Sequence, residues 1–177
     1  MIVALCAVGL VGCGTTAPSA GSASPDRAAL LTYLREIEPL RLAVNSLLGR
    51  ADPILDANHD RRISPAQAGA RMGALERRFA AYTVDVAAIT PATPALRALQ
   101  GEYAHTYILE DAYLSALASG LAEGELADLP DTQAQQRAAI IQWRTGLTVL
   151  ARQDHAALPA DLQQAGRGEI APSPDGS

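Results

Sequence analysis

Apolar residues recur along most of the chain at spacings of three and four, the period that places them on one face of an α-helix. The clearest run lies within residues 64–89, where the two spacings alternate without a break. It consists of Ala68, Met72, Leu75, Phe79, Tyr82, Val86 and Ile89. Such a narrow stripe is typical of a helix that packs along its length against other helices. The chain lacks the β-branched and aromatic runs that would indicate strands.

The same periodicity predicts four helices in all. They span 26–48, 64–89, 94–121 and 132–158. Pro39 is expected to kink the first helix or split it, and Thr132 with Gln135 fits a capping box at the start of the last. Antiparallel helices joined by short connections favour an all-α, up-down-up-down four-helix bundle. A three-helix bundle with a kinked or split first helix is the alternative.

Composition narrows the class of protein. The chain has 177 residues, enough for one domain. Its formal net charge is −5 and only 4% of its residues are aromatic. A nucleic-acid partner is therefore not expected, because such a protein needs a basic surface to displace the counterions of the phosphates.

The N-terminal segment predicts export and a lipid anchor. Residues 2–13 carry no charge and are too short to span a membrane, but have the length of a signal-peptide core. They end in Leu10-Val11-Gly12-Cys13, which resembles the lipobox of bacterial lipoproteins. The resemblance implies cleavage after Gly12 and an acyl lipid on Cys13. The positive charge that usually opens a signal peptide is missing, which leaves open a start further upstream or a weak signal.

The lipobox sets the predicted domain organisation. Residues 1–12 form the signal peptide, 13–25 a flexible tether rich in Gly, Ser, Thr and Pro, 26–158 the helical bundle domain and 159–177 a largely disordered tail. The protein is expected at the cell membrane, anchored by its lipid on the extracytoplasmic side. Because the only cysteines are Cys6 and Cys13, no disulfide is expected in the mature chain.

The connection between the first two predicted helices contains a candidate calcium site. Residues 56–67 resemble the twelve-residue calcium loop of EF-hand proteins. The candidate ligands are the oxygen-bearing residues Asp56, Asn58, Asp60 and Ser64, whose spacing matches that loop. Arg61 stands where the family has glycine, and Gln67 stands where it has a bidentate glutamate. A polar turn between two helices is the alternative.

A second candidate lies in the apolar stripe of 94–121, which Tyr103, Thr106 and Glu110 interrupt. A buried carboxylate must be paired or neutralised. We expect Glu110 to pair with an arginine such as Arg144. Alternatively, the three residues form the polar lining of a small pocket within the bundle.

One further pair of residues has the spacing of a metal motif. Glu102 and His105 resemble half of the paired Glu-x-x-His motif of ferritin-like di-iron bundles. A second copy is missing from the sequence. The pair is therefore interpreted as two exposed residues on one helical turn.

No recognisable catalytic set is present, so the protein is not expected to be an enzyme. The sequence favours a non-enzymatic interaction or scaffold module of the cell envelope, with another envelope protein as its partner. The alternative is a cation-responsive or small-ligand binding module that uses the 56–64 loop or a bundle pocket. No cofactor is expected besides the acyl lipid on Cys13, with calcium as the alternative. An enzyme built on Glu110, His105 and an arginine is a third hypothesis.

Overall fold

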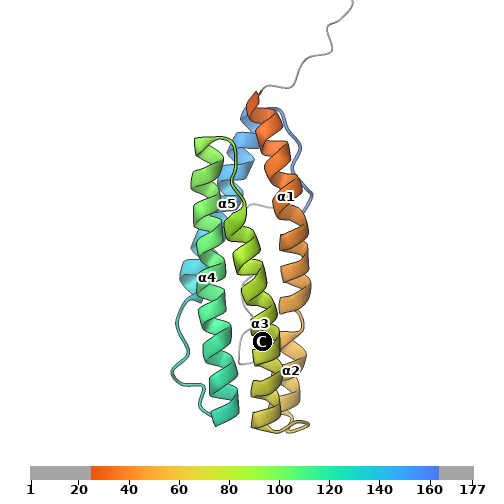
Figure 1. Ribbon diagram of the computed structural model, residues 1–177, viewed down its shortest axis with the longest axis vertical. Coiled ribbons are helices and arrows are strands. Elements are labelled where there is room, and N and C mark those ends of the chain that lie inside the picture. Colours follow the sequence, from red (N-terminus) through yellow and green to blue (C-terminus); the bar gives the residue numbers. More distant parts are fainter. Residues whose placement is uncertain (1–24, 164–177) are drawn as a thin grey trace, which may run out of the picture.

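The computed structural model describes residues 25–163, which form helices and no strands. The helices are α1 (Pro25–Leu48), α2 (Ala51–His59), α3 (Pro65–Ala88), α4 (Pro94–Glu123) and α5 (Gln133–Gln153). α1 and α2 follow one another in a single column, so four columns run alternately down and up the molecule (Figure 1). The predicted all-α, up-down-up-down four-helix bundle is confirmed.

The first column is split, but not at the proline expected to split it. α1 runs through Pro39, and the chain breaks instead at Gly49 and Arg50. Pro39 stands among good helix formers. At the break two effects coincide: glycine is weak in a helix, and the ring of Pro53 would clash with the Gly49 carbonyl in a continuous helix. The alternative of a three-helix bundle is therefore wrong in its number of columns, although the first helix is indeed split.

Helix starts follow from the backbone of the residue before each helix. Ser64 is extended (ψ 157°), and its hydroxyl accepts a hydrogen bond from the Gln67 backbone while the Gln67 side chain accepts one from the Ser64 backbone. Thr93 caps α4 in the same extended conformation. Thr132 instead has a helical backbone (ψ −14°) and makes no side-chain cap. The predicted capping box at Thr132 is wrong, because a capping side chain needs the extended backbone to reach the first turn.

α3 and α4 form the most closely packed pair of helices in the bundle. At their contact, a methyl group added to Gly69 would come within 2.6 Å of the Ala122 Cβ and 2.8 Å of the Ala118 carbonyl oxygen. Larger side chains could not be accommodated between these backbones. Small residues therefore set the distance between the two helices.

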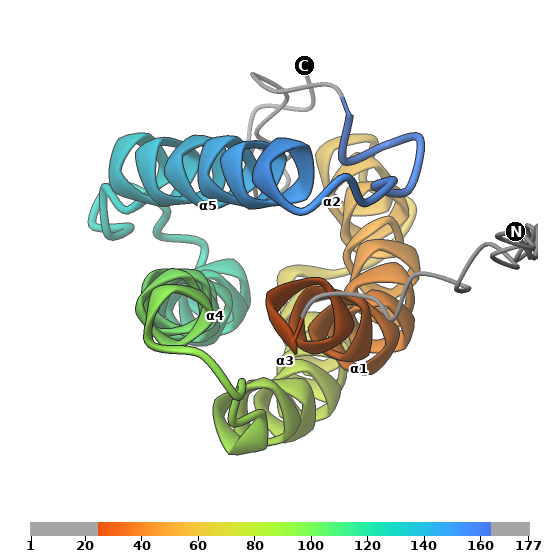
Figure 2. The same ribbon diagram turned by 90° about the horizontal axis from the view of Figure 1, so that it is seen from above.

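The last helix and the segment after it cover only part of the bundle. α5 begins near mid-height, after the connection 124–132, and runs upward beside α4 (Figure 1). Residues 154–163 then turn back from α5 towards α1 (Figure 2). Leu158 and Leu162 of this segment are buried. The predicted disordered tail, 159–177, thus starts with residues that pack on the bundle; residues 164–177 lie outside the described part of the chain.

Candidate functional site

A small cavity of about 60 Å³ lies inside the bundle, with all four columns contributing to its walls. Its lining consists of Val44, Asn45 and Leu48 from α1, Phe79 from α3, Tyr103, Thr106, Tyr107 and Glu110 from α4, and Gln136 and Ile140 from α5. Glu110 is buried, whereas Asn45 is exposed. The cavity therefore extends from a buried carboxyl group to the surface beside α1.

α4 supplies most of the polar lining. Tyr103, Thr106, Tyr107 and Glu110 are three or four residues apart, so they project from one side of the helix. Tyr103, Thr106 and Glu110 are each 5% exposed. These three residues, which interrupt the apolar stripe of 94–121, thus line one cavity. This is the arrangement expected if they form the polar lining of a small pocket.

Glu110 does not pair with Arg144, contrary to our first expectation. Its Oε1 atom is buried and has no hydrogen-bond partner, and Arg144 donates to the backbone oxygen of Asp161 at 3.2 Å. Gln136 lies opposite the carboxyl instead. Arg144 lies about two turns beyond Gln136 on α5, which is about 12 Å along the helix axis. It is therefore at a different height from Glu110.

Burial dominates the electrostatics of the Glu110 carboxyl. It raises the pKa of Glu110 to about 7, and the Gln136 side chain opposes this rise. The group is therefore poised to exchange a proton near neutral pH.

Aromatic rings form the wall above Glu110. Tyr107 packs edge-on against Tyr103 (centroids 5.3 Å apart) and stacks with Phe79 (5.5 Å), while Tyr103 stacks with Trp143 (4.0 Å). The two tyrosine hydroxyls share a hydrogen bond of 3.1 Å. Burial raises the pKa of Tyr107 to about 12 and that of Tyr103 well above its ordinary value. Both phenols therefore stay neutral at physiological pH.

A chain of satisfied hydrogen bonds lies beyond this wall. Trp143 donates its indole N–H to the Tyr33 hydroxyl at 2.9 Å, and Tyr33 donates to Gln100 Oε1 at 2.7 Å. Gln100 in turn donates to the Val86 carbonyl at 2.6 Å. These bonds connect α5, α1, α4 and α3, so they fix the four columns relative to one another.

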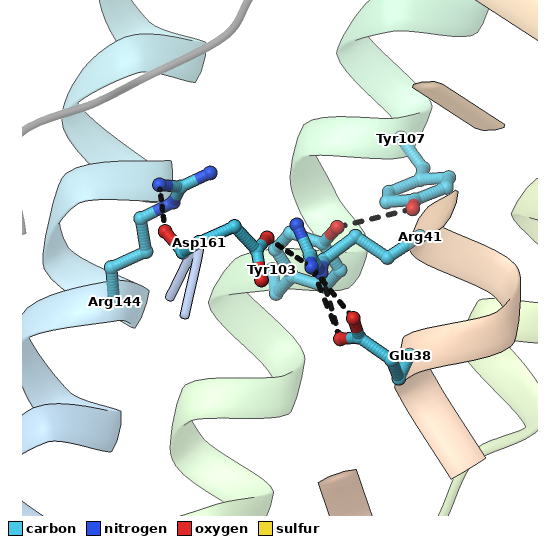
Figure 3. Close-up of polar contacts among 6 residues, drawn as sticks. All are labelled: Glu38, Arg41, Tyr103, Tyr107, Arg144 and Asp161. Carbon is cyan, nitrogen blue, oxygen red and sulfur yellow. Dashed lines mark hydrogen bonds and ion pairs between the residues drawn. The ribbon is translucent and has the colours of Figure 1, made fainter. Parts of the chain in front are cut away.

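Figure 3 shows a cluster of charged residues beside Tyr103 and Tyr107. Arg41 is 3% exposed and forms ion pairs with Glu38, at 3.0 Å, and with Asp161. Arg144 binds the Asp161 backbone from the other side (Figure 3). The two arginines and two carboxylates balance in charge. They attach the segment 154–163 to α1 and α5.

Two buried polar residues of the core, Gln136 and Gln100, were not predicted from the sequence. Gln136 lies four residues before Ile140 and seven before Trp143, so it continues the apolar face of α5. Gln100 interrupts the face of α4 in the same way, between Leu96 and Tyr103. A polar residue at an apolar register is the signal that could have identified both.

The candidate calcium ligands do not share one loop. Asp56 and Asn58 belong to α2, Asp60 follows its end and contacts Arg62 (3.1 Å), and Ser64 caps α3. Arg61 takes the left-handed backbone (φ 57°) that the loop family assigns to glycine. Within the described residues no group of three His, Cys, Asp or Glu side chains could hold a metal ion. Calcium binding here stays a prediction.

The remaining candidates lie away from the cavity. Glu102 and His105 are exposed on α4. Cys13, the lipobox and residues 14–24 lie outside the described part of the chain. Between residues 25 and 163, no helix combines the length and apolar character needed to cross a membrane.

Comparison with known proteins adds no relative. No protein-family model, curated protein or solved structure matches this chain.

Proposed function

We propose that this protein is a membrane-anchored, extracytoplasmic lipoprotein whose helical domain is a non-enzymatic module that binds a small polar ligand. The anchor is supported by the sequence Leu10-Val11-Gly12-Cys13 and its resemblance to a lipobox. Ligand binding is placed in the cavity beside Glu110. One observation carries this placement: the buried Oε1 of Glu110 has no hydrogen-bond partner where the residue lines a cavity.

No protein group donates a hydrogen bond to this oxygen. A buried acceptor without any donor costs about 1–3 kcal/mol, so the site favours a molecule that brings a donor. Elsewhere in the same core, Tyr33, Gln100 and Trp143 satisfy one another. Of the cavity's lining residues, Glu110 and Gln136 each carry a buried polar atom without a partner, and a molecule bound there would supply one.

Docking of another envelope protein on the helical surface is the second candidate. Its support is the exposure of large apolar side chains, one on each of four helices. They are Leu42, Val84, Ile108 and Val149. Such residues, scattered singly, are common on soluble surfaces, so this candidate ranks below the cavity.

A ligand screen with two matched variants tests the binding function. The full chain in detergent is screened by ligand-observed NMR against small amines, alcohols, amides and carboxylates. Ile140→Trp fills the half-buried wall of the cavity, and Ile141→Trp adds the same bulk at the next, half-buried position outside the lining. We expect binding that Ile140→Trp abolishes and Ile141→Trp preserves. A screen without any signal sensitive to Ile140→Trp would overturn the proposal.

The anchor has its own test. Intact-mass analysis of the protein from cell membranes should show loss of residues 1–12 and a mass increase corresponding to acyl lipid. Cys13→Ser should abolish both changes and release the protein from the membrane. An unprocessed, unlipidated chain would contradict the anchor while leaving the cavity proposal intact.

A further inference from the structure

The polar groups around the cavity are rich in acceptors. Glu110 Oε1 accepts no hydrogen bond. Thr106 donates its hydroxyl proton to the Tyr103 carbonyl at 2.7 Å, so the lone pairs of its oxygen remain for other donors. The Gln136 amide, whose Nε2 also has no hydrogen-bond partner, presents either its N–H or its oxygen depending on how the group is turned. A ligand that donates hydrogen bonds fits this set best.

Charge distinguishes between neutral and cationic donors. Among the lining residues, α1, α3 and α5 contribute no charged side chain, and Tyr103 and Tyr107 are neutral phenols. Glu110 is thus the one acidic group of the lining. Arg41 is not part of the lining and is already engaged in ion pairs with Glu38 and Asp161. A carboxylate left alone in such surroundings is neutralised by a proton or by a cation.

The walls also suit a positive charge. The rings of Phe79, Tyr103 and Tyr107 line the cavity, and the faces of aromatic rings attract cations within about 6 Å. At about 60 Å³ the cavity has room for roughly four water-sized groups.

We infer that the cavity binds a protonated primary amine, with its ammonium group against Glu110 and a short alkyl chain among the aromatic rings. This inference rests on the proposed function, because it names the ligand class of the same cavity. A longer amine would leave its remainder outside, beside the exposed Asn45.

The inference predicts linkage between binding and a proton. Because Glu110 titrates near pH 7 when the cavity is empty, an ammonium group must displace its proton at lower pH. Affinity should therefore rise about tenfold per pH unit below pH 7 and level off above pH 8.

Calorimetry on the full chain in detergent tests the ligand class with three probes of similar size: propylammonium, 1-propanol and propionate. We expect propylammonium to bind at least tenfold more tightly than the other two. Heats measured in buffers of different ionisation enthalpy should reveal proton release at pH 6 and none at pH 8.5.

Two variants complete the experiment. Glu110→Gln should weaken propylammonium binding at least tenfold and remove the proton release. Glu102→Gln, at an exposed position of the same helix, is the matched control and should change neither. Thermal unfolding of both variants verifies that they fold.

The outcomes separate the two proposals. If 1-propanol or propionate binds as tightly as propylammonium and Ile140→Trp abolishes that binding, the amine inference is overturned while the cavity remains a binding site. If propylammonium binds equally to Glu110→Gln, the inference is overturned as well. If neither these probes nor the wider screen gives binding sensitive to Ile140→Trp, the proposed function falls with it.

Discussion

The contact between α3 and α4 and the cavity beside Glu110 are built on opposite principles. At the contact, Gly69 and two alanines bring the backbones so close that no methyl group can be added. At the cavity, the side chains enclose a space of about 60 Å³ next to a carboxyl oxygen to which no protein group donates a hydrogen bond. Tight packing of small groups stabilises a fold, whereas a void and an unsatisfied polar atom cost stability. The first region therefore stabilises the bundle, and the second is the region to which we assign binding in our proposal.

Replacement of Glu110 should give the largest effect, and in the stabilising direction. The pKa of Glu110 is about 7 in the folded protein and near its ordinary value of 4.5 when unfolded. Between these pH values the folded protein binds more protons, so its stability falls as pH rises through this window. The Glu110→Gln variant cannot ionise at this position. Between pH 4 and pH 8, the free energy of unfolding of the variant should therefore rise by roughly 3 kcal/mol relative to that of the parent.

Urea unfolding of both proteins from pH 4 to pH 8 measures this effect. Glu102→Gln, at its exposed position, should run parallel to the parent throughout. Parallel curves for Glu110→Gln and the parent would mean that the buried carboxyl does not cost stability.

Gly69→Ala should destabilise the protein, in contrast to Glu110→Gln, because it changes the tightly packed contact between α3 and α4. The added methyl would meet the Ala122 Cβ at 2.6 Å, and overpacking of this kind costs about 1–3 kcal/mol. Gly101→Ala is the matched control on α4, where nothing lies within 4 Å of the new methyl. It should stabilise the protein by about 1 kcal/mol through helix propensity. Equal effects of the two substitutions on chemical unfolding would show that the α3–α4 contact is not tightly packed.

Tyr33→Phe tests the satisfied hydrogen bonds that border the cavity. It removes the hydroxyl that bridges the Trp143 indole and the Gln100 side chain, and so leaves two buried groups without this partner. We expect a loss of about 1–2 kcal/mol in the free energy of unfolding. Tyr82→Phe, at a half-buried position, should change it by less than about 0.5 kcal/mol. A loss no greater for Tyr33→Phe would argue that the network does not hold the four columns together.

The smallest effect is expected at a helix end outside both regions. Arg61 follows α2 with a left-handed backbone (φ 57°), and Arg62 N–H bonds to the Ala57 carbonyl at 2.8 Å, as in a Schellman motif. Arg61→Gly should therefore stabilise the fold by about 1 kcal/mol. The converse substitution Gly124→Ala, at φ 78° after α4, should destabilise it by a similar amount. Thermal unfolding measures both shifts, and a neutral Arg61→Gly would contradict the assigned strain.

The sequence predicts features that depend on local periodicity. The unbroken spacing within 64–89 predicted a helix, and α3 spans Pro65–Ala88. The spacing within 94–121 likewise predicted that Tyr103, Thr106 and Glu110 share one face of α4. Spacings of three and four residues determine the face of a helix without reference to other helices.

Features that depend on the relative height of two helices could not be predicted. The spacing on α4 and α5 gives no axial register, so Arg144 was paired with Glu110 although Gln136 lies opposite it. The ion pair of Arg41 with Asp161 joins residues 120 positions apart, and no local pattern connects them. For the same reason Asp161 was assigned to a disordered tail.

Both proposals depend on Glu110 being a buried carboxyl whose Oε1 atom gains a hydrogen-bond donor when a cationic ligand binds. The most direct test of this claim is the pKa of the Glu110 side chain, measured by ¹³C NMR on the full chain with and without propylammonium. We predict a value near 7 in the empty protein, and a fall of at least one unit when propylammonium is bound. An ordinary value in the empty protein, or a pKa that propylammonium leaves unchanged, would contradict the claim.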